Sequence, residues 1–239
     1  MPEQTLHFDA ILFDMDGTLV DSTDGVVGAW QKFAESYPGI DVHEILSSSH
    51  GVRTVENLRI HCGITDPGEL EREAQRFEEA IVNSASKDGG RGIVPLPGVL
   101  EIMQDLLPGS KFPNVRWALC TSATRNYATA ALKAAGVPAP DVFVASEDVT
   151  KGKPEPDPYL LGAKLCNVHP AKCLVVEDAP AGVRSGKAAG CKTLAVLTSH
   201  TREQLEAAQP DFVVKDLSKV TMKLGDLPLG GVDVTIRDD

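Results

Sequence analysis

Two carboxylates stand next to an apolar segment near the start of the chain. Asp14 and Asp16 follow the run Ala10–Phe13 with one residue between them, and Gly17 and Thr18 come next. Aspartate is depleted in strands, so two of them at the end of a predicted buried strand indicate a chemical role. One carboxylate can attack as a nucleophile, and a second one nearby can donate and accept protons.

Further polar side chains follow other predicted strands. Thr121 and Ser122 come after one apolar segment, Glu177 and Asp178 end another, and Lys153 stands in a loop before a proline. Ligands bind at the carboxyl ends of strands in open parallel sheets, so we expect these side chains to meet there. Carboxylate oxygens suit Mg²⁺, and a lysine can offset charge on a transferring group. The set predicts phosphoryl transfer assisted by Mg²⁺.

The elements that position these residues alternate between short apolar runs and helical patterns. We expect strands at 115–121, 142–145, 173–177, 193–197 and 212–214, with helices at 125–135, 156–166, 180–189 and 201–208. Such alternation predicts an α/β fold, a parallel sheet with helices on both faces.

The rest of the chain surrounds this series. A first strand is expected within 6–20, ending at Gly17, and the tail after residue 220 alternates apolar and polar residues as an edge hairpin does. Helices are expected at 22–46, 54–62 and 67–84, and a Gly- and Pro-rich linker at 84–98. We therefore expect a catalytic core formed by 1–21 and 96–239, with a small helical cap domain at 22–95.

Composition narrows the class of partner. The chain has 239 residues, 42% of them hydrophobic, and a net charge of −11 without a Lys- or Arg-rich run. This balance disfavours nucleic acid and anionic membranes. The five cysteines include no C-x-x-C pair, and no apolar stretch is long enough to span a membrane. We expect a cytoplasmic monomer that acts on a small molecule.

Four segments carry a family resemblance. DMDGT (14–18), TS (121–122), KGKPEPDPY (151–159) and VVEDAPAGVRSGKAAG (175–190) resemble the ordered motifs of the haloacid dehalogenase (HAD) superfamily. The resemblance covers essentially the whole chain. It implies a Rossmann-like core with a helical cap, and Mg²⁺ as cofactor.

The resemblance also implies roles for individual residues. Asp14 would be the nucleophile and a metal ligand, and Asp16 the general acid/base, which also gives its carbonyl to the metal. Asp178 would bind the metal, with Glu177 a ligand or a neighbour of one, and Lys153 would contact the transferring group. Ser122 would bind the phosphoryl group, with Thr121 as the alternative and Ala123 beside them in the substrate site.

A cap segment narrows the expected substrate. SHGVRT (49–54) resembles the HG-x-RT segment of the fungal glycerol-phosphate and 2-deoxyglucose-6-phosphate phosphatases, which act on small polyol and sugar phosphates. By this analogy Arg53 and His50 would contact the substrate. The resulting hypothesis is a Mg²⁺-dependent phosphatase that works through an aspartyl-phosphate intermediate.

Two alternatives stay open on the sequence. One is a sugar phosphomutase of the same superfamily, which would require a bisphosphate activator. The pair Gly17-Thr18 resembles the phosphatase form, because Val or Ile commonly follows the glycine in mutases. The other is a non-catalytic phosphate-binding regulatory protein, which would release no phosphate.

Overall fold

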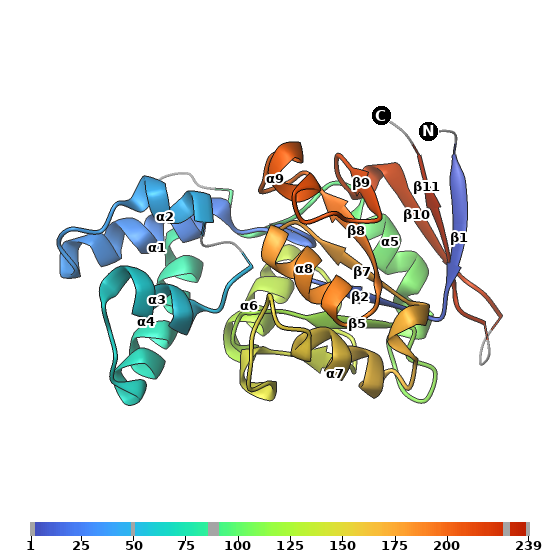
Figure 1. The fold of residues 1–239 in the computed structure, drawn as a ribbon, viewed down its shortest axis with the longest axis horizontal. Coiled ribbons are helices and arrows are strands. Elements are labelled where there is room, and N and C mark those ends of the chain that lie inside the picture. Colours follow the sequence, from blue (N-terminus) through green and yellow to red (C-terminus); the bar gives the residue numbers. More distant parts are fainter. Residues whose placement is uncertain (1–2, 49–50, 86–90, 227–229, 238–239) are drawn as a thin grey trace.

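A parallel sheet lies at the centre of the molecule (Figure 1). The computed structural model describes residues 3–48, 51–85, 91–226 and 230–237. The six-stranded sheet has the order β6-β5-β2-β7-β8-β9, and each neighbouring pair is parallel. Its strands are β2 (Ala10–Phe13), β5 (Trp117–Cys120), β6 (Phe143–Val144), β7 (Cys173–Glu177), β8 (Lys192–Val196) and β9 (Phe212–Val214). The predicted α/β class is confirmed.

Helices cover both faces of this sheet (Figure 1). They are α5 (Val99–Leu106), α6 (Arg125–Ala135), α7 (Asp157–Leu165), α8 (Pro180–Ala188) and α9 (Arg202–Glu206), with 3₁₀ turns at Leu107–Gly109, Ser146–Asp148, Pro170–Lys172 and Leu217–Lys219. Successive side chains of a strand point to opposite faces. Phe13 of β2 accordingly packs in one apolar cluster with residues of α5 and α6, while Leu12 packs in a second with Tyr159 of α7.

Two expectations about the core need correction. No helix was expected at α5, although its buried residues have helical spacing: Val99, Ile102, Met103 and Leu106. The predicted strand within 6–20 is divided into β1 (Gln4–Phe8), β2 and β3 (Val20–Asp21).

The tail forms the predicted hairpin, but away from the parallel sheet. β10 (Val220–Leu224) and β11 (Val232–Ile236) pair antiparallel, and β1 adds to β11 to give a separate three-stranded sheet. Leu6 lies opposite Val234, and the His7 ring contacts Asp233 at 2.7 Å. Because β1 and β11 are at opposite ends of the chain, neither local pattern could reveal this pairing.

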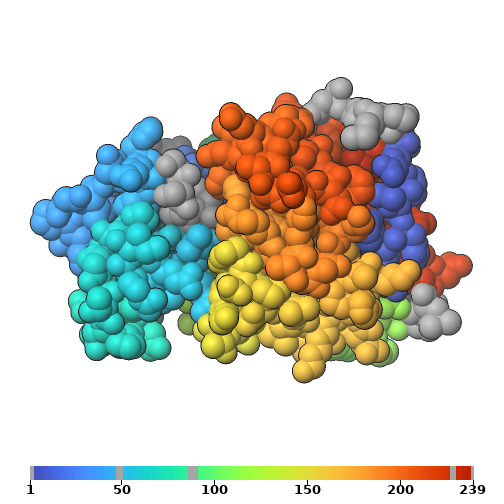
Figure 2. Space-filling view, viewed as in Figure 1, coloured from blue at the N-terminus to red at the C-terminus, as the bar shows by residue number. Residues whose placement is uncertain are grey.

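Helices α1–α4 form a separate group beside the core, which we call the cap (Figures 1 and 2). They are α1 (Thr23–Ser36), α2 (Val42–Ser48), α3 (Thr54–Cys62) and α4 (Pro67–Ala85). Phe77 lies 4.5 Å from Trp30 and 5.0 Å from Phe33 between ring centroids, so α4 packs on α1 through aromatic side chains. The predicted helix at 22–46 is in fact α1 and α2, because Pro38 and the positive φ of Gly39 (106°) interrupt it.

The chain passes between core and cap through a short two-stranded ladder. β3 pairs antiparallel with β4 (Val94–Pro95), which aligns the outgoing and returning segments.

Within the described part of the chain, no helix is both long enough and apolar enough to cross a membrane.

Candidate active site

Adjacent strand ends bring the sequence-predicted residues together. β2 lies between β5 and β7 in the sheet, so Asp14 follows the central strand of the three while Thr121 and Glu177 stand at the ends of its neighbours. The Asp14 amide still donates to Val176 O at 3.0 Å, which keeps this residue in register with the sheet. Sheet order therefore explains why residues so distant in the chain meet.

Gly17 turns the chain immediately after the two aspartates. Its φ is 80°, and its amide donates to Val20 O at 2.8 Å. A Cβ at Gly17 would lie 2.2 Å from Asp178 Oδ2, so a side chain there would displace that carboxylate. The glycine thus allows Asp14 to stay in the strand register while Asp16 leaves it.

Three buried carboxylates form a compact cluster. Oxygens of Asp14, Glu177 and Asp178 lie within 4.8 Å of one another, and these residues are 4%, 0% and 1% exposed. Lys153 Nζ contacts Asp14 Oδ1 at 2.5 Å and Glu177 Oε1 at 2.8 Å. One ammonium thus faces three carboxylates, and the cluster retains negative charge that suits a hard cation.

The oxygens of Glu177 already have partners. Oε1 accepts from Lys153 and from the Tyr159 hydroxyl at 2.7 Å, and Oε2 accepts the amides of Asp178 and Ala179 at 3.0 and 3.1 Å. A Cβ at Gly182 would overlap Glu177 Oε1 at 1.6 Å, so the first turn of α8 can approach only as glycine. This geometry makes Glu177 well suited to hold Lys153 in place.

Asp178 offers the oxygen that a cation would need. Thr18 donates to its Oδ1 at 3.2 Å, whereas Oδ2 is buried and has no hydrogen-bond partner among the described residues. A buried polar atom without a partner is costly, and a bound metal ion would remove that cost. The donor set of carboxylate oxygens fits Mg²⁺.

Burial and mutual repulsion set the protonation of the cluster. Burial raises the pKa of Asp14 well above its usual range, and the charges of Glu177 and Asp178 add to this against the opposing effect of Lys153. The pKa of Asp178 is raised to about 7, first by burial and then by Glu177. Burial would lower the pKa of Lys153, but the two carboxylates it contacts outweigh this and raise it. Lys153 is therefore charged, and the carboxylates favour a counter-cation.

Asp16 lies apart from this cluster and is held by two hydroxyls. Ser22 donates to its Oδ1 at 2.6 Å and Tyr127 donates to the same oxygen at 2.9 Å. Burial raises the pKa of Asp16, opposed by these two hydrogen bonds. A carboxyl group with a raised pKa is a suitable proton donor near neutral pH.

The segment after β5 presents two hydroxyls in different ways. Thr121 Oγ1 accepts the Ala123 amide at 3.1 Å, which leaves its own proton to donate. Ser122 instead donates to Gly51 O of the cap at 2.9 Å. Both residues and Ala123 line a cavity of about 90 Å³ that also contains Asp14 and Asp16.

Of the two predicted cap residues, the structure describes Arg53. Arg53 Nη2 donates to Val149 O at 3.0 Å, its side chain packs where a Cβ of Gly152 would be, and it does not line the cavity that contains Asp14. His50 lies outside the described residues. On the cap side the cavity is bordered instead by Thr54, Asn57, Phe77 and Glu78.

Several of these side chains were not singled out from the sequence. Tyr127, Tyr159 and Glu78 occupy buried helix positions, where periodicity indicates only packing. Thr18 is part of the DMDGT motif, but no contact was predicted for it, and only its closeness to the aspartate pair points to Ser22.

Comparison with known proteins agrees with this geometry. Residues 8–190 match the family of haloacid dehalogenase-like hydrolases. Hexitol phosphatase A of Escherichia coli is 39% identical over 88% of this chain and 92% of its own, and glycerol-1-phosphate phosphohydrolase 2 of Saccharomyces cerevisiae is 33% identical over 89% and 84%.

A solved structure of another hydrolase has a similar fold. A hydrolase from Pseudomonas syringae superposes with a TM-score of 0.72 at 27% identity, over 87% of this chain and 94% of its own. The family match spans the strands that carry Asp14, Thr121 and Glu177, and the curated relatives that match are named phosphatases. The chain belongs to the haloacid dehalogenase-like hydrolases, as a phosphoric monoester hydrolase.

Proposed function

We propose that this hydrolase is a Mg²⁺-dependent phosphatase of small polyol or sugar phosphates that works through an aspartyl-phosphate. The observation that carries the proposal is the cluster of Asp14, Glu177 and Asp178 around Lys153, with Asp16 within reach of the same cavity. Asp14 and Asp178 would hold Mg²⁺, with the carbonyl of Asp16. When bound, the ion would offset negative charge on the phosphoryl oxygens.

The side chains support a two-step transfer. The Asp14 carboxylate attacks phosphorus, the bond from phosphorus to the leaving oxygen breaks, and that oxygen takes a proton from Asp16. Water then attacks the phosphorus of the aspartyl-phosphate and gives a proton to Asp16. The bond to Asp14 breaks and phosphate leaves. Lys153 keeps the Asp14 carboxylate oriented and offsets charge in both steps.

The cavity supports a neutral leaving group. None of the described residues that line it is basic, and its charged lining consists of Asp14, Asp16 and Glu78. A second phosphate would therefore find no cationic side chain among these lining residues and would be repelled by the acids, whereas hydroxyl groups can pair with Ser22, Thr54 and Asn57. This favours a polyol or sugar monophosphate and disfavours the bisphosphate that a mutase requires. The named substrates of hexitol phosphatase A and glycerol-1-phosphate phosphohydrolase 2 are of that class.

A substrate panel tests the proposal. Phosphate release from glycerol, hexitol, deoxyglucose, hexose and pentose phosphates is measured with Mg²⁺ or with EDTA. We expect release from a small subset, only with Mg²⁺. No release by the folded protein would contradict the proposal; release that depends on added bisphosphate would identify a mutase instead.

Thr121 and Ser122 give a prediction about the phosphoryl group. Because the Thr121 hydroxyl keeps its proton to donate while that of Ser122 is engaged by Gly51 O, we expect Thr121→Val to lower kcat/KM about 100-fold. Ser122→Ala should lower it about 10-fold or less. Steady-state kinetics on the best substrate decides the order, and a larger loss for Ser122→Ala would assign the phosphoryl contact to Ser122.

The raised pKa of Asp178 predicts how stability depends on metal and pH. A carboxyl group whose pKa rises from 3.8 to about 7 on folding binds more protons in the folded state than in the unfolded state. The free energy of unfolding therefore falls as the pH rises from about 4 to about 7. Mg²⁺ binds the ionised carboxylate of the folded protein and so restores the lost stability. We therefore expect Mg²⁺ to raise Tm more at pH 8 than at pH 5, with a smaller gain for Asp178→Asn. Thermal denaturation with Mg²⁺ or EDTA measures this, and equal shifts at both pH values would contradict it.

A further inference from the structure

Asp16 is bound through one of its two oxygens. Ser22 and Tyr127 both donate to Oδ1, at 2.6 and 2.9 Å, and neither of these bonds involves Oδ2. A carboxyl group fixed through one oxygen can present the other to a leaving oxygen or a water molecule. The orientation of Asp16 thus depends on where Tyr127 is held.

Tyr127 is a buried residue in the first turn of α6. It is 5% exposed, and burial raises the pKa of its hydroxyl well above the usual range, so it remains a hydrogen-bond donor. Its amide donates to Oγ1 of Thr124, the residue that caps this helix, at 3.4 Å. The position of the Tyr127 ring therefore follows the position of Thr124.

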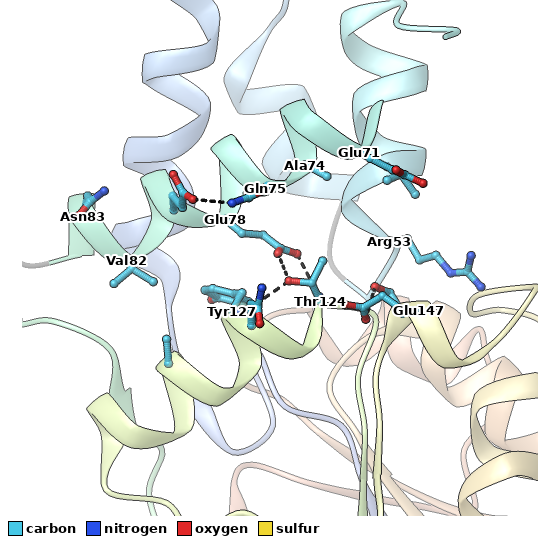
Figure 3. Close-up of a pocket in the computed structure, with 15 residues that line it drawn as sticks. Arg53, Glu71, Ala74, Gln75, Glu78, Val82, Asn83, Thr124, Tyr127 and Glu147 are labelled. Carbon is cyan, nitrogen blue, oxygen red and sulfur yellow. Dashed lines mark hydrogen bonds between the residues drawn. The ribbon is translucent and has the colours of Figure 1, made fainter. Parts of the chain in front are cut away.

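Thr124 is in turn held by Glu78 from the cap (Figure 3). The Thr124 amide donates to Glu78 Oε1 at 3.1 Å, and its hydroxyl donates to Oε2. Thr54, also in the cap, donates to Oε1 at 3.1 Å. One carboxylate on α4 thus joins the cap to the start of a core helix.

Glu78 has an unusual environment for a carboxylate. It is 4% exposed, and no lysine or arginine of the described residues forms an ion pair with it. Burying a carboxylate without a cation is costly. The amide and hydroxyl at the N-terminus of the eleven-residue helix α6 provide two of the three compensating hydrogen bonds, and the Thr54 hydroxyl provides the third. That requirement ties Glu78 to Thr124 more strictly than packing alone would.

Glu78 and Tyr127 also border two spaces. Glu78 and Tyr127 line both the cavity that contains Asp14 and a wider cleft of about 620 Å³ between α4 and α6 (Figure 3). Asp16 lines the smaller cavity and not the wider cleft, so the contact between cap and core lies at the border that the two spaces share.

We propose that Glu78 and Tyr127 are positioning residues for Asp16, so that contact between the cap and α6 sets the orientation of the acid/base. The proposal rests on the proposed function, since it assumes that Asp16 transfers protons. Glu78 orients Thr124, Thr124 fixes the first turn of α6, and Tyr127 on that turn holds Asp16.

Leaving-group dependence provides the test. The value of kcat/KM reports the steps through departure of the first product. Acetate leaves acetyl phosphate without protonation, whereas an alkoxide leaving group needs a proton. We expect Tyr127→Phe and Glu78→Gln to lower kcat/KM about 10-fold or more for the best alkyl phosphate of the panel. The value for acetyl phosphate should change at most about 2-fold. A merely structural role would lower both values alike.

Matched variants and a double variant complete the design. Tyr37→Phe and Glu79→Gln alter residues of the same types in the cap that do not contact Asp16 or Thr124, and should match the wild type. The double variant Glu78→Gln/Tyr127→Phe should lose no more than the larger single loss, because both act through one path.

Four outcomes would overturn the proposal. Equal losses on both substrates would show a general structural effect, and multiplying losses in the double variant would show independent roles. Unchanged values in both single variants, while Asp16→Asn shows the split between substrates, would reject the positioning role and leave the proposed function intact. A wild-type protein that hydrolyses none of the substrates would reject the proposed function and this proposal with it.

Discussion

Asp14→Asn is expected to abolish phosphate release, with a loss of at least about 10,000-fold on every substrate. An amide does not attack phosphorus, and the substituted side chain also loses its charge toward Mg²⁺. The neighbours should stay in place, because Lys153 keeps its contact with Glu177 at 2.8 Å and Glu177 keeps its hydrogen bond from Tyr159. Initial-rate assays with excess enzyme would measure the residual activity.

A matched substitution and a trapping experiment accompany the Asp14→Asn variant. Asp105→Asn changes an exposed aspartate on α5 that does not line the cavity with Asp14, and should keep wild-type rates. Acid quenching with ³²P-labelled substrate should trap a phosphoenzyme in the wild type and none in Asp14→Asn. A folded Asp14→Asn protein that still turns over substrate would assign the nucleophile to another residue.

Much of the fold could be predicted because its signals are local. Each strand of the parallel sheet is a short apolar run, and β9 was predicted with the bounds that the structure gives, Phe212–Val214. Elements that depend on distant partners were predicted less well. β1 pairs with β11 from the other end of the chain, and nothing within residues 4–13 distinguishes a strand of one sheet from a strand of another.

The site shows the same division. Asp14, Lys153 and Asp178 follow strands or stand before a proline, as do Ser122 and its alternative Thr121. Their meeting at one edge of the sheet could therefore be predicted from the sequence, and these side chains lie close together in the structure. Tyr127 and Glu78 are buried helix residues whose partners are set by how the cap meets the core. Substrate contact by Arg53 stays a prediction: its guanidinium donates to Val149 O, and Arg53 does not line the cavity that contains Asp14. The geometry between cap and core, which no local pattern contains, decides where such a side chain points.

Asp16→Asn, unlike Asp14→Asn, should leave phosphorylation of Asp14 possible for some substrates while it slows hydrolysis of the aspartyl-phosphate. Without a proton donor, kcat/KM for the best alkyl phosphate should fall about 100- to 10,000-fold. Asparagine can still accept hydrogen bonds from Ser22 and Tyr127, so the cavity should keep its shape. Acetyl phosphate, whose acetate needs no proton, should still phosphorylate Asp14 at a rate close to that of the wild type.

The second step then reveals the base. Attack by water on the aspartyl-phosphate requires a proton acceptor. Lys153 binds neither Asp16 nor Glu78 of the cavity lining, but both oxygens of Glu78 accept hydrogen bonds from Thr124, so Asp16 is the carboxylate left for this role. Mixing Asp16→Asn with acetyl phosphate should therefore release one equivalent of acetate in a burst and then stall, while phosphoenzyme accumulates. Rapid-quench measurement of both products tests this. A stall would identify Asp16 as the base, because a residue that serves only as acid cannot delay the departure of phosphate. Steady turnover of acetyl phosphate at the wild-type rate would show instead that dephosphorylation uses a different base.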